Sequence, residues 1–175
     1  MKIRDKIDKF VISNGYQTDV AIDRIIPYLK NLEEAGEFTL NLSPDFQRPL
    51  KWDNQRCIDY LEYIIKGGQS GRILYFNCPS WEYKDPNGDK EIVIVDGQQR
   101  LEAIRKFYNN EIKVFDCYFK EIEDVFCLGW LKININSLKT KKEVLKWYLG
   151  INAGGIPHTK EDIEKVEKML NKEWF

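Results

Sequence analysis

Residues 91–111 read EIVIVDGQQRLEAIRKFYNNE and place a β-branched run, Ile92–Val95, directly before a helical pattern. The run stops at Asp96 and Gly97, which predicts a strand that turns straight into a helix. The first N–H groups of a helix lack intrahelical partners and carry partial positive charge, and glycine lets an anion approach the backbone closely. Arg100, in the first turn, adds a guanidinium that can contact two phosphate oxygens. This stretch therefore predicts a site for the phosphate of a nucleotide or polynucleotide.

A plain structural corner is the main alternative, because strand–glycine–helix turns are common and Asp-Gly is ordinary turn chemistry. The residue types favour a site, since the corner combines one carboxylate, two amides and one guanidinium. Asp96 can hold Mg²⁺ or act as a general base, and either glutamine can orient a water molecule or read a nucleobase edge. The candidate catalytic residues are therefore Asp96, Gln98, Gln99 and Arg100, and the candidate phosphate ligands here are Gly97 and Arg100.

Three further segments accompany this corner: PDFQRPLKW at residues 44–52, GGQSGRI at 67–73 and INAGG at 151–155. Together with DGQQR, they resemble the DGQQR-motif family of ParB/sulfiredoxin-like domains, the N-terminal module of GmrSD-type restriction enzymes. The resemblance covers about residues 16–170. It implies an α+β fold, with a small mixed β-sheet flanked by helices, and a role in phage defence through NTP hydrolysis or DNA nicking. The family's usual prolines are absent from residues 67–73, which leaves the pocket role of that loop open.

The resemblance also implies that the QRP segment lies beside the DGQQR corner, so that Gln47 and Arg48 become further candidate phosphate contacts. For Arg48, a structural salt bridge is an equally frequent alternative. Trp52 is more typical of a core residue under a helix than of a base-stacking platform. The INAGG segment is most simply explained as the C-terminal cap of a helix.

Length and composition predict one globular domain over residues 1–175, since 43% of the 175 residues are hydrophobic and 31% are charged. The net charge of −1 provides no global basic field that would attract DNA. The apolar runs are far shorter than the roughly 20 residues that a membrane helix needs. Residues 1–15 contain no apolar core of a secretory signal. We therefore expect a cytoplasmic protein without a membrane partner.

Cysteine and histidine usage narrows the chemistry. The four cysteines have no C-x-x-C spacing, which predicts reduced core thiols rather than a disulfide framework. The single histidine, His158, excludes a multi-histidine metal site and a compact HNH nuclease motif. We therefore expect no appended HNH nuclease domain in this chain.

Two classes of function stay open on these observations. The first is an enzyme, an NTPase or a DNA endonuclease, with Mg²⁺ as its candidate cofactor and a nucleoside triphosphate as substrate or ligand. The second is a non-catalytic module that senses a nucleotide or DNA, or a subunit or decoy that acts with a separately encoded nuclease or as a homo-oligomer. Trp174 and Phe175 are candidate contacts for such a partner.

Apolar periodicity predicts the remaining elements. Helices are expected over residues 2–13, 21–35, 54–66, 98–110, 139–149 and 160–171, and strands over residues 38–42, 72–77, 91–95, 113–119 and 129–135. Asp53 is the expected N-cap of the third helix, and Pro27 is expected near the first turn of the second.

Overall fold

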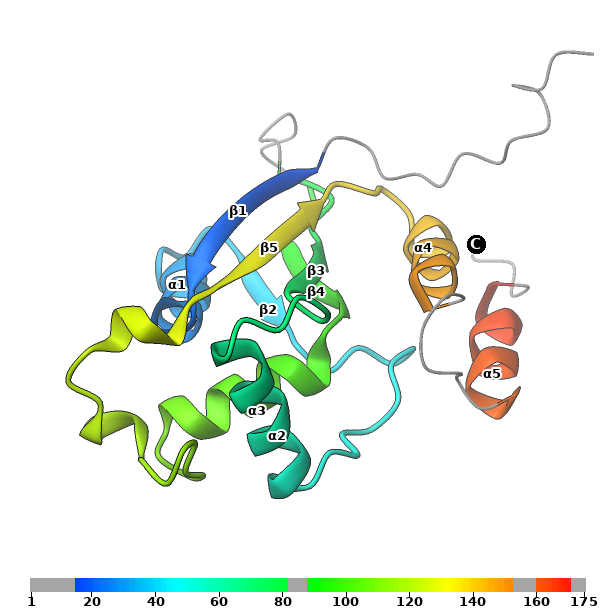
Figure 1. The fold of residues 1–175 in the computed structure, drawn as a ribbon. Coiled ribbons are helices and arrows are strands. Elements are labelled where there is room, and N and C mark those ends of the chain that lie inside the picture. The colour runs from blue at the N-terminus through cyan, green and yellow to red at the C-terminus, as the bar shows by residue number, and fades with distance from the viewer. Residues whose placement is uncertain (1–14, 82–87, 153–159, 171–175) are drawn as a thin grey trace, which may run out of the picture.

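The computed structural model describes residues 15–81, 88–152 and 160–170. A mixed sheet in the order β1-β5-β3-β4-β2 forms its centre (Figure 1). The strands are β1 (Tyr16–Ala21), β2 (Thr39–Asn41), β3 (Ile73–Asn77), β4 (Glu91–Asp96) and β5 (Trp130–Asn136). The β1–β5 and β3–β4 pairs are antiparallel, whereas the β3–β5 and β2–β4 pairs are parallel.

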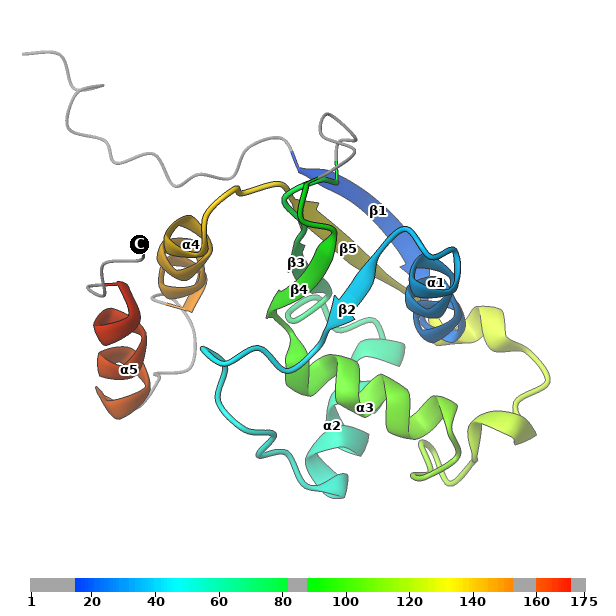
Figure 2. The same ribbon diagram turned by 180° about the vertical axis from the view of Figure 1, so that it is seen from behind.

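Helices lie on both sides of this sheet, α1–α3 on one side and α4 with α5 on the other (Figures 1 and 2). Their bounds are α1 (Ile22–Glu34), α2 (Asn54–Ile65), α3 (Gln98–Tyr108), α4 (Lys141–Asn152) and α5 (Lys160–Leu170), and two short 3-10 turns are η2 (Phe119–Glu121) and η3 (Val125–Leu128). The structure confirms the predicted α+β class with a small mixed sheet flanked by helices.

Strand β4 is buried from both sides, which explains its unbroken β-branched sequence. Ile92 and Ile94 are fully buried in the larger core, which contains residues of α1, α2 and α3. Val95 belongs to a second core together with Leu145 and Trp147 of α4. Because β4 packs against both cores, its C-terminal end holds the following corner in a fixed position.

Residues 114–117 form a tight turn where a strand was predicted. The strand predicted over residues 113–119 is wrong, because Val114 and Cys117 exchange two backbone hydrogen bonds across a tight turn. Phe115 and Asp116 occupy the turn with φ of +51° and +61°, the left-handed geometry of a two-residue hairpin. Pro27 lies inside α1, just after the first turn near which it was expected.

The cysteine prediction is confirmed in part. All four thiols are free, and Cys57 and Cys78 are buried, which raises the pKa of both thiols. Cys117 and Cys127 are exposed, so they are not core residues. In the described part of the chain, no helix has the length and apolar character that crossing a membrane requires. The helix expected over residues 2–13 lies outside the described residues.

Candidate functional site

The corner between β4 and α3 turns from strand to helix at Gly97. Gly97 has φ of +103°, and a Cβ placed there would lie 2.6 Å from Cδ2 of Leu74, so only glycine fits without strain. Helix α3 begins at the next residue, and Leu101 is the first residue whose N–H bonds back into the turn, to the Gly97 carbonyl at 2.8 Å. Within the described residues, no protein group accepts from the N–H groups of residues 98–100. The start of α3 therefore presents unpaired donors at its positive end.

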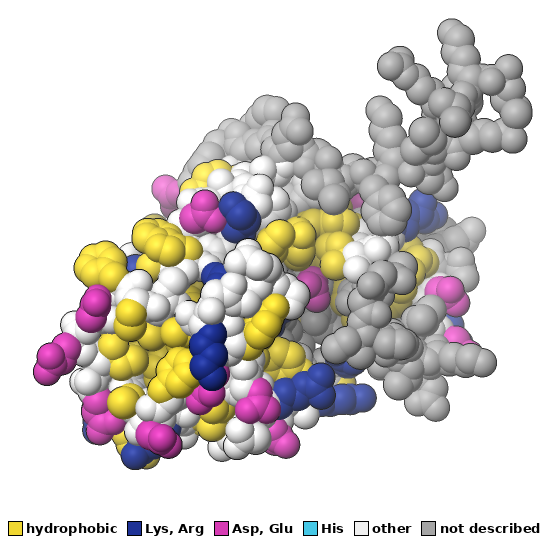
Figure 3. Space-filling view, in the orientation of Figure 1, with side chains coloured by type: hydrophobic (Ala, Val, Ile, Leu, Met, Phe, Trp, Pro, Cys, Tyr) yellow, Lys and Arg dark blue, Asp and Glu magenta, His cyan; other side chains and the backbone are white. Residues whose placement is uncertain are grey.

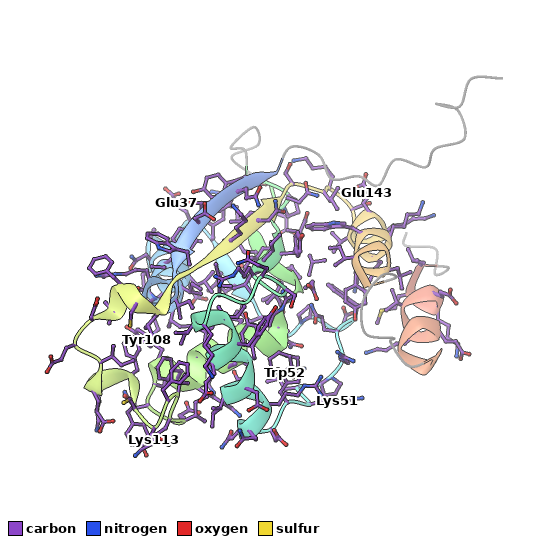
Figure 4. The ribbon with its side chains drawn as sticks, viewed as in Figure 1. Glu37, Lys51, Trp52, Tyr108, Lys113 and Glu143 are labelled. Atoms are coloured by element: carbon purple, nitrogen blue, oxygen red, sulfur yellow. The ribbon has the colours of Figure 1, made fainter. Side chains whose placement is uncertain are left out.

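A cavity of about 480 Å³ opens at this corner. Its wall is built from residues of the PDFQRPLKW segment, α2, the glycine loop at residues 67–71, the start of α3 and the end of α4. Trp52 lies half-buried beside α2, with its ring centroid 5.4 Å from that of Tyr60 (Figure 4). A volume of this size is in the range of small-ligand sites.

Arg100 and Asp96 face each other across the first turn of α3 and form an ion pair between Nη2 and Oδ2. Nη1 of Arg100 donates to the Ile73 carbonyl at 2.8 Å. Each terminal nitrogen of Arg100 therefore already has a protein partner, and a phosphate would use the remaining N–H groups. The two side chains are only 15% and 26% exposed, which strengthens their electrostatic interaction.

The two motif glutamines have separate structural contacts. Gln98 is buried, and its Nε2 donates to the Leu42 carbonyl at 3.0 Å. Gln99 clamps the PDFQRPLKW segment: its Oε1 accepts from the backbone N–H groups of Lys51 and Trp52, at 2.9 and 3.0 Å. Both side chains therefore hold residues 42–52 against the corner, and their assignment as catalytic groups stays a prediction.

Gln47 and Arg48 both border the cavity but differ in their contacts. Nε2 of Gln47 donates to the carbonyls of Ile94 and Val95, at 3.0 and 2.9 Å, and fastens the segment to the end of β4. The donors of Gln47 are thereby engaged, and its phosphate contact stays a prediction. Arg48 forms no hydrogen bond or ion pair with the described residues, so its charge is available to an anion in the cavity.

The lining includes one carboxylate among the described residues, that of Asp96. No group of three or more potential metal ligands occurs in the described ranges. Proteins often bind Mg²⁺ through one or two carboxylates together with substrate phosphates. The residues present therefore fit Mg²⁺ only as a site shared with a bound phosphate, in which Asp96 is the protein ligand.

Two tyrosines of α2 hold the glycine loop at the cavity wall, and neither was identified from the sequence. Tyr60 donates its hydroxyl to the Gly71 carbonyl at 3.0 Å, and burial raises the pKa of Tyr60 to about 12. Tyr63 bonds to Ser70, and hydrogen bonds from Ser70 lower the pKa of Tyr63. Their i, i+3 spacing next to a glycine-rich segment is the signal that could have identified them, because it places both on one helix face.

The surface shown in Figure 3 is not dominated by one sign of charge. Hydrophobic, acidic and basic side chains are interspersed on the face in view (Figure 3), in agreement with the net charge of −1. Gly154, Gly155 and His158, and the candidate partner contacts Trp174 and Phe175, lie outside the described residues. The C-cap expected at the INAGG segment is therefore neither confirmed nor contradicted.

Comparison with known proteins yields one family. The model of the GmrSD restriction endonuclease, N-terminal domain, matches residues 29–128. This range covers more than half of the 175 residues and contains PDFQRPLKW, the glycine loop and DGQQR. No curated protein and no solved structure matches the chain. The ParB/sulfiredoxin-like part of the fold assignment therefore stays a prediction.

Proposed function

This chain belongs to the family of GmrSD restriction endonuclease N-terminal domains, and from that premise we propose that it binds a nucleotide through its phosphates at the β4–α3 corner. The family places it in a restriction-type, phage-defence context. The observation that carries the proposal is that Arg48 and the first residues of α3 line one cavity. Neither the Arg48 guanidinium nor the N–H groups of residues 98–100 have a partner among the described residues.

The electrostatics of the corner favour an anion over a neutral ligand. The positive end of α3, the remaining N–H groups of Arg100 and the Arg48 guanidinium provide donors from α3 and from the PDFQRPLKW segment. Gly97 has no side chain that would keep a phosphate oxygen away from these backbone donors. Asp96 offsets part of this positive charge through its ion pair with Arg100, so a triphosphate with bound Mg²⁺ fits the corner better than a free polyanion.

Hydrolysis of the nucleoside triphosphate is the reaction that we assign to this site, with Asp96 as Mg²⁺ ligand or as the base that accepts a proton from water. In this structure the Asp96 carboxylate is ion-paired with Arg100. In either role it therefore has to act on the metal or the water while it also contacts Arg100. The same ion pair favours a second candidate function, a module that senses a nucleotide or a DNA end without turnover. In that case cleavage of foreign DNA is the task of a separately encoded nuclease partner.

The experiment that tests the proposal is a thermal unfolding series with each NTP and dNTP, with and without Mg²⁺. A ligand at about 100 times its dissociation constant stabilises by roughly 2.7 kcal/mol, which corresponds to several degrees in Tm. Arg48→Ala is expected to lose most of the shift, because it removes a charge without breaking a contact among the described residues. Arg24→Ala removes the same charge from an exposed position on α1 and should keep the shift. Absence of a shift with every nucleotide would contradict the proposal.

A further inference from the structure

Resting on this proposed function, we propose that the nucleobase of the ligand stacks on the ring of Tyr63 while its phosphates bind at the start of α3. The site then recognises a base next to a phosphate, the chemistry of a nucleotide, rather than polyphosphate alone. Tyr63 borders the same cavity as the corner and is 45% exposed. A nucleobase stacks with its flat face on the face of an aromatic ring, so the ring has to be accessible to the ligand.

The ring of Tyr63 is held in place before any ligand binds. Its hydroxyl is 2.9 Å from Oγ of Ser70 and accepts a hydrogen bond from the Ser70 backbone N–H at 3.2 Å. Most exposed aromatic side chains lose rotamer freedom when they bind a ligand, and this loss of entropy weakens binding. Because two hydrogen bonds to Ser70 already fix the ring, Tyr63 loses little further rotamer freedom when a ligand binds.

Gly68 supports the ring from the backbone. A Cβ at this position would come within 2.4 Å of the Tyr63 ring, so any larger residue would displace it. Gly68 is not in the left-handed region, unlike Gly67 and Gly71, so close approach to the ring is the reason that a glycine fits here. The glycine loop therefore packs against the Tyr63 ring and helps to fix its position, in addition to forming a turn.

The same loop joins the ring to the phosphate end of the cavity. Ser70, which bonds to Tyr63, is followed by Gly71, and a Cβ on Gly71 would lie 3.5 Å from Cδ of Arg100. Tyr60 pins this connection through its hydrogen bond to the Gly71 carbonyl. The Tyr63 ring and the first turn of α3 thus both contact the glycine loop and line the same cavity.

Exposure alone does not mark a binding residue, since single exposed aromatics are normal on protein surfaces. Phe126 illustrates this, because it is 82% exposed, does not line this cavity and has no hydroxyl to anchor it. Tyr63 differs in all three respects. Phe126 is therefore the matched control for Tyr63.

Isothermal titration of the full chain with tripolyphosphate, with each NTP and with a 5′-phosphorylated oligothymidylate tests the inference. Base stacking contributes about 1–3 kcal/mol, so NTPs should bind roughly 5- to 150-fold more tightly than tripolyphosphate. Tyr63→Leu should abolish this preference, so that NTPs and tripolyphosphate bind the variant equally tightly. Tyr63→Phe keeps the ring but loses the hydrogen bonds that fix it, so it should retain part of the preference. Phe126→Leu alters an exposed ring elsewhere and should retain all of it.

If Tyr63→Leu keeps the full preference for NTPs, the stacking inference is wrong while phosphate binding at the corner stands. If neither tripolyphosphate nor any nucleotide binds the wild type, the proposed function is wrong and the inference is overturned with it. Tighter binding of the oligonucleotide than of any NTP, lost in Tyr63→Leu, would support the inference and assign the base and phosphate to single-stranded nucleic acid.

Discussion

The side-chain oxygen of Gln99 accepts a hydrogen bond of 3.0 Å from the backbone N–H of Trp52. The same oxygen accepts from Lys51, and the amide nitrogen of Gln99 donates to the Pro49 carbonyl at 3.3 Å. One side chain of the DGQQR motif therefore satisfies three backbone groups of the PDFQRPLKW segment. The two motifs form a single hydrogen-bonded unit, which places Arg48 at the cavity.

Gln99→Met should destabilise the fold by about 1.5–3 kcal/mol, because three backbone groups lose their partner while the side-chain volume is nearly kept. Urea unfolding measures this loss of free energy, and hydrogen exchange should show faster exchange at Lys51 and Trp52. Gln55→Met is the control, because Gln55 is exposed and bonds only to Asp59 among the described residues. Equal stability of the two variants would contradict the clamping role.

Gly97→Ala should be more damaging than Gly36→Ala, although both positions have positive φ. At Gly36 no atom lies within 4 Å of the added methyl group, so the cost is the backbone strain of about 1–2 kcal/mol. At Gly97 the methyl group also meets Leu74 at 2.6 Å, and the start of α3 has to shift. Thermal unfolding of both variants compares these costs. A Tm for Gly97→Ala equal to or above that of Gly36→Ala would show that the corner tolerates a side chain.

The sequence predicts well the helix caps and turns that depend on neighbouring residues. Asp53 was expected as the N-cap of α2, and its side chain accepts from the Arg56 N–H at 2.8 Å. The glycine pair after α2 and the strand–glycine–helix corner are likewise encoded by adjacent residues, so propensity and turn geometry are sufficient to predict them. Of these positions, the strand–glycine–helix corner lines the candidate site.

Contacts between distant residues explain what sequence reasoning missed. The segment YQTDVA of β1 has no clear alternation and was not predicted as a strand, yet it pairs with β5 from Tyr16 opposite Ile135 to Ala21 opposite Trp130. The roles of Gln98 and Gln99 depend on carbonyl and N–H groups about 50 residues away. Backbone groups carry no sequence signature, so a glutamine that binds them cannot be distinguished from one that binds a ligand.

Stability should fall in alkaline solution partly through Tyr60. Its pKa is raised from 10.0 to about 12 by burial, so the folded state favours the neutral phenol. This contribution is complete below the unfolded pKa near 10 and is lost as pH rises towards 12. Tyr60→Phe removes the titrating group and also the hydrogen bond to Gly71, which costs about 1 kcal/mol near neutral pH.

The variant should consequently be less stable than the wild type at neutral pH and lose less stability between pH 10 and 12. Urea unfolding across this range gives the free energies, and the ultraviolet absorbance of tyrosinate reports ionisation in the folded state. Parallel pH profiles for wild type and variant would show that Tyr60 does not contribute to the alkaline loss.

Asp96→Asn separates an enzyme from a sensor. The substitution keeps the shape of the side chain, removes its charge and frees Arg100 from the ion pair. In the absence of Mg²⁺, phosphate binding should therefore be as tight as in the wild type or tighter. Turnover should fall by about 10²- to 10⁴-fold if Asp96 acts as the base, since this is the usual contribution of a positioned proton acceptor.

Titration calorimetry with a nucleotide and phosphate release in the presence of Mg²⁺ measure the two effects separately. Asp59→Asn removes a carboxylate from the exposed face of α2 and should leave both quantities unchanged. A wild type that binds the nucleotide tightly without releasing phosphate would reject hydrolysis and leave the sensing module. Loss of binding in Asp96→Asn would mean that the ion pair with Arg100 is needed to shape the corner, and that the carboxylate acts on the ligand through Arg100.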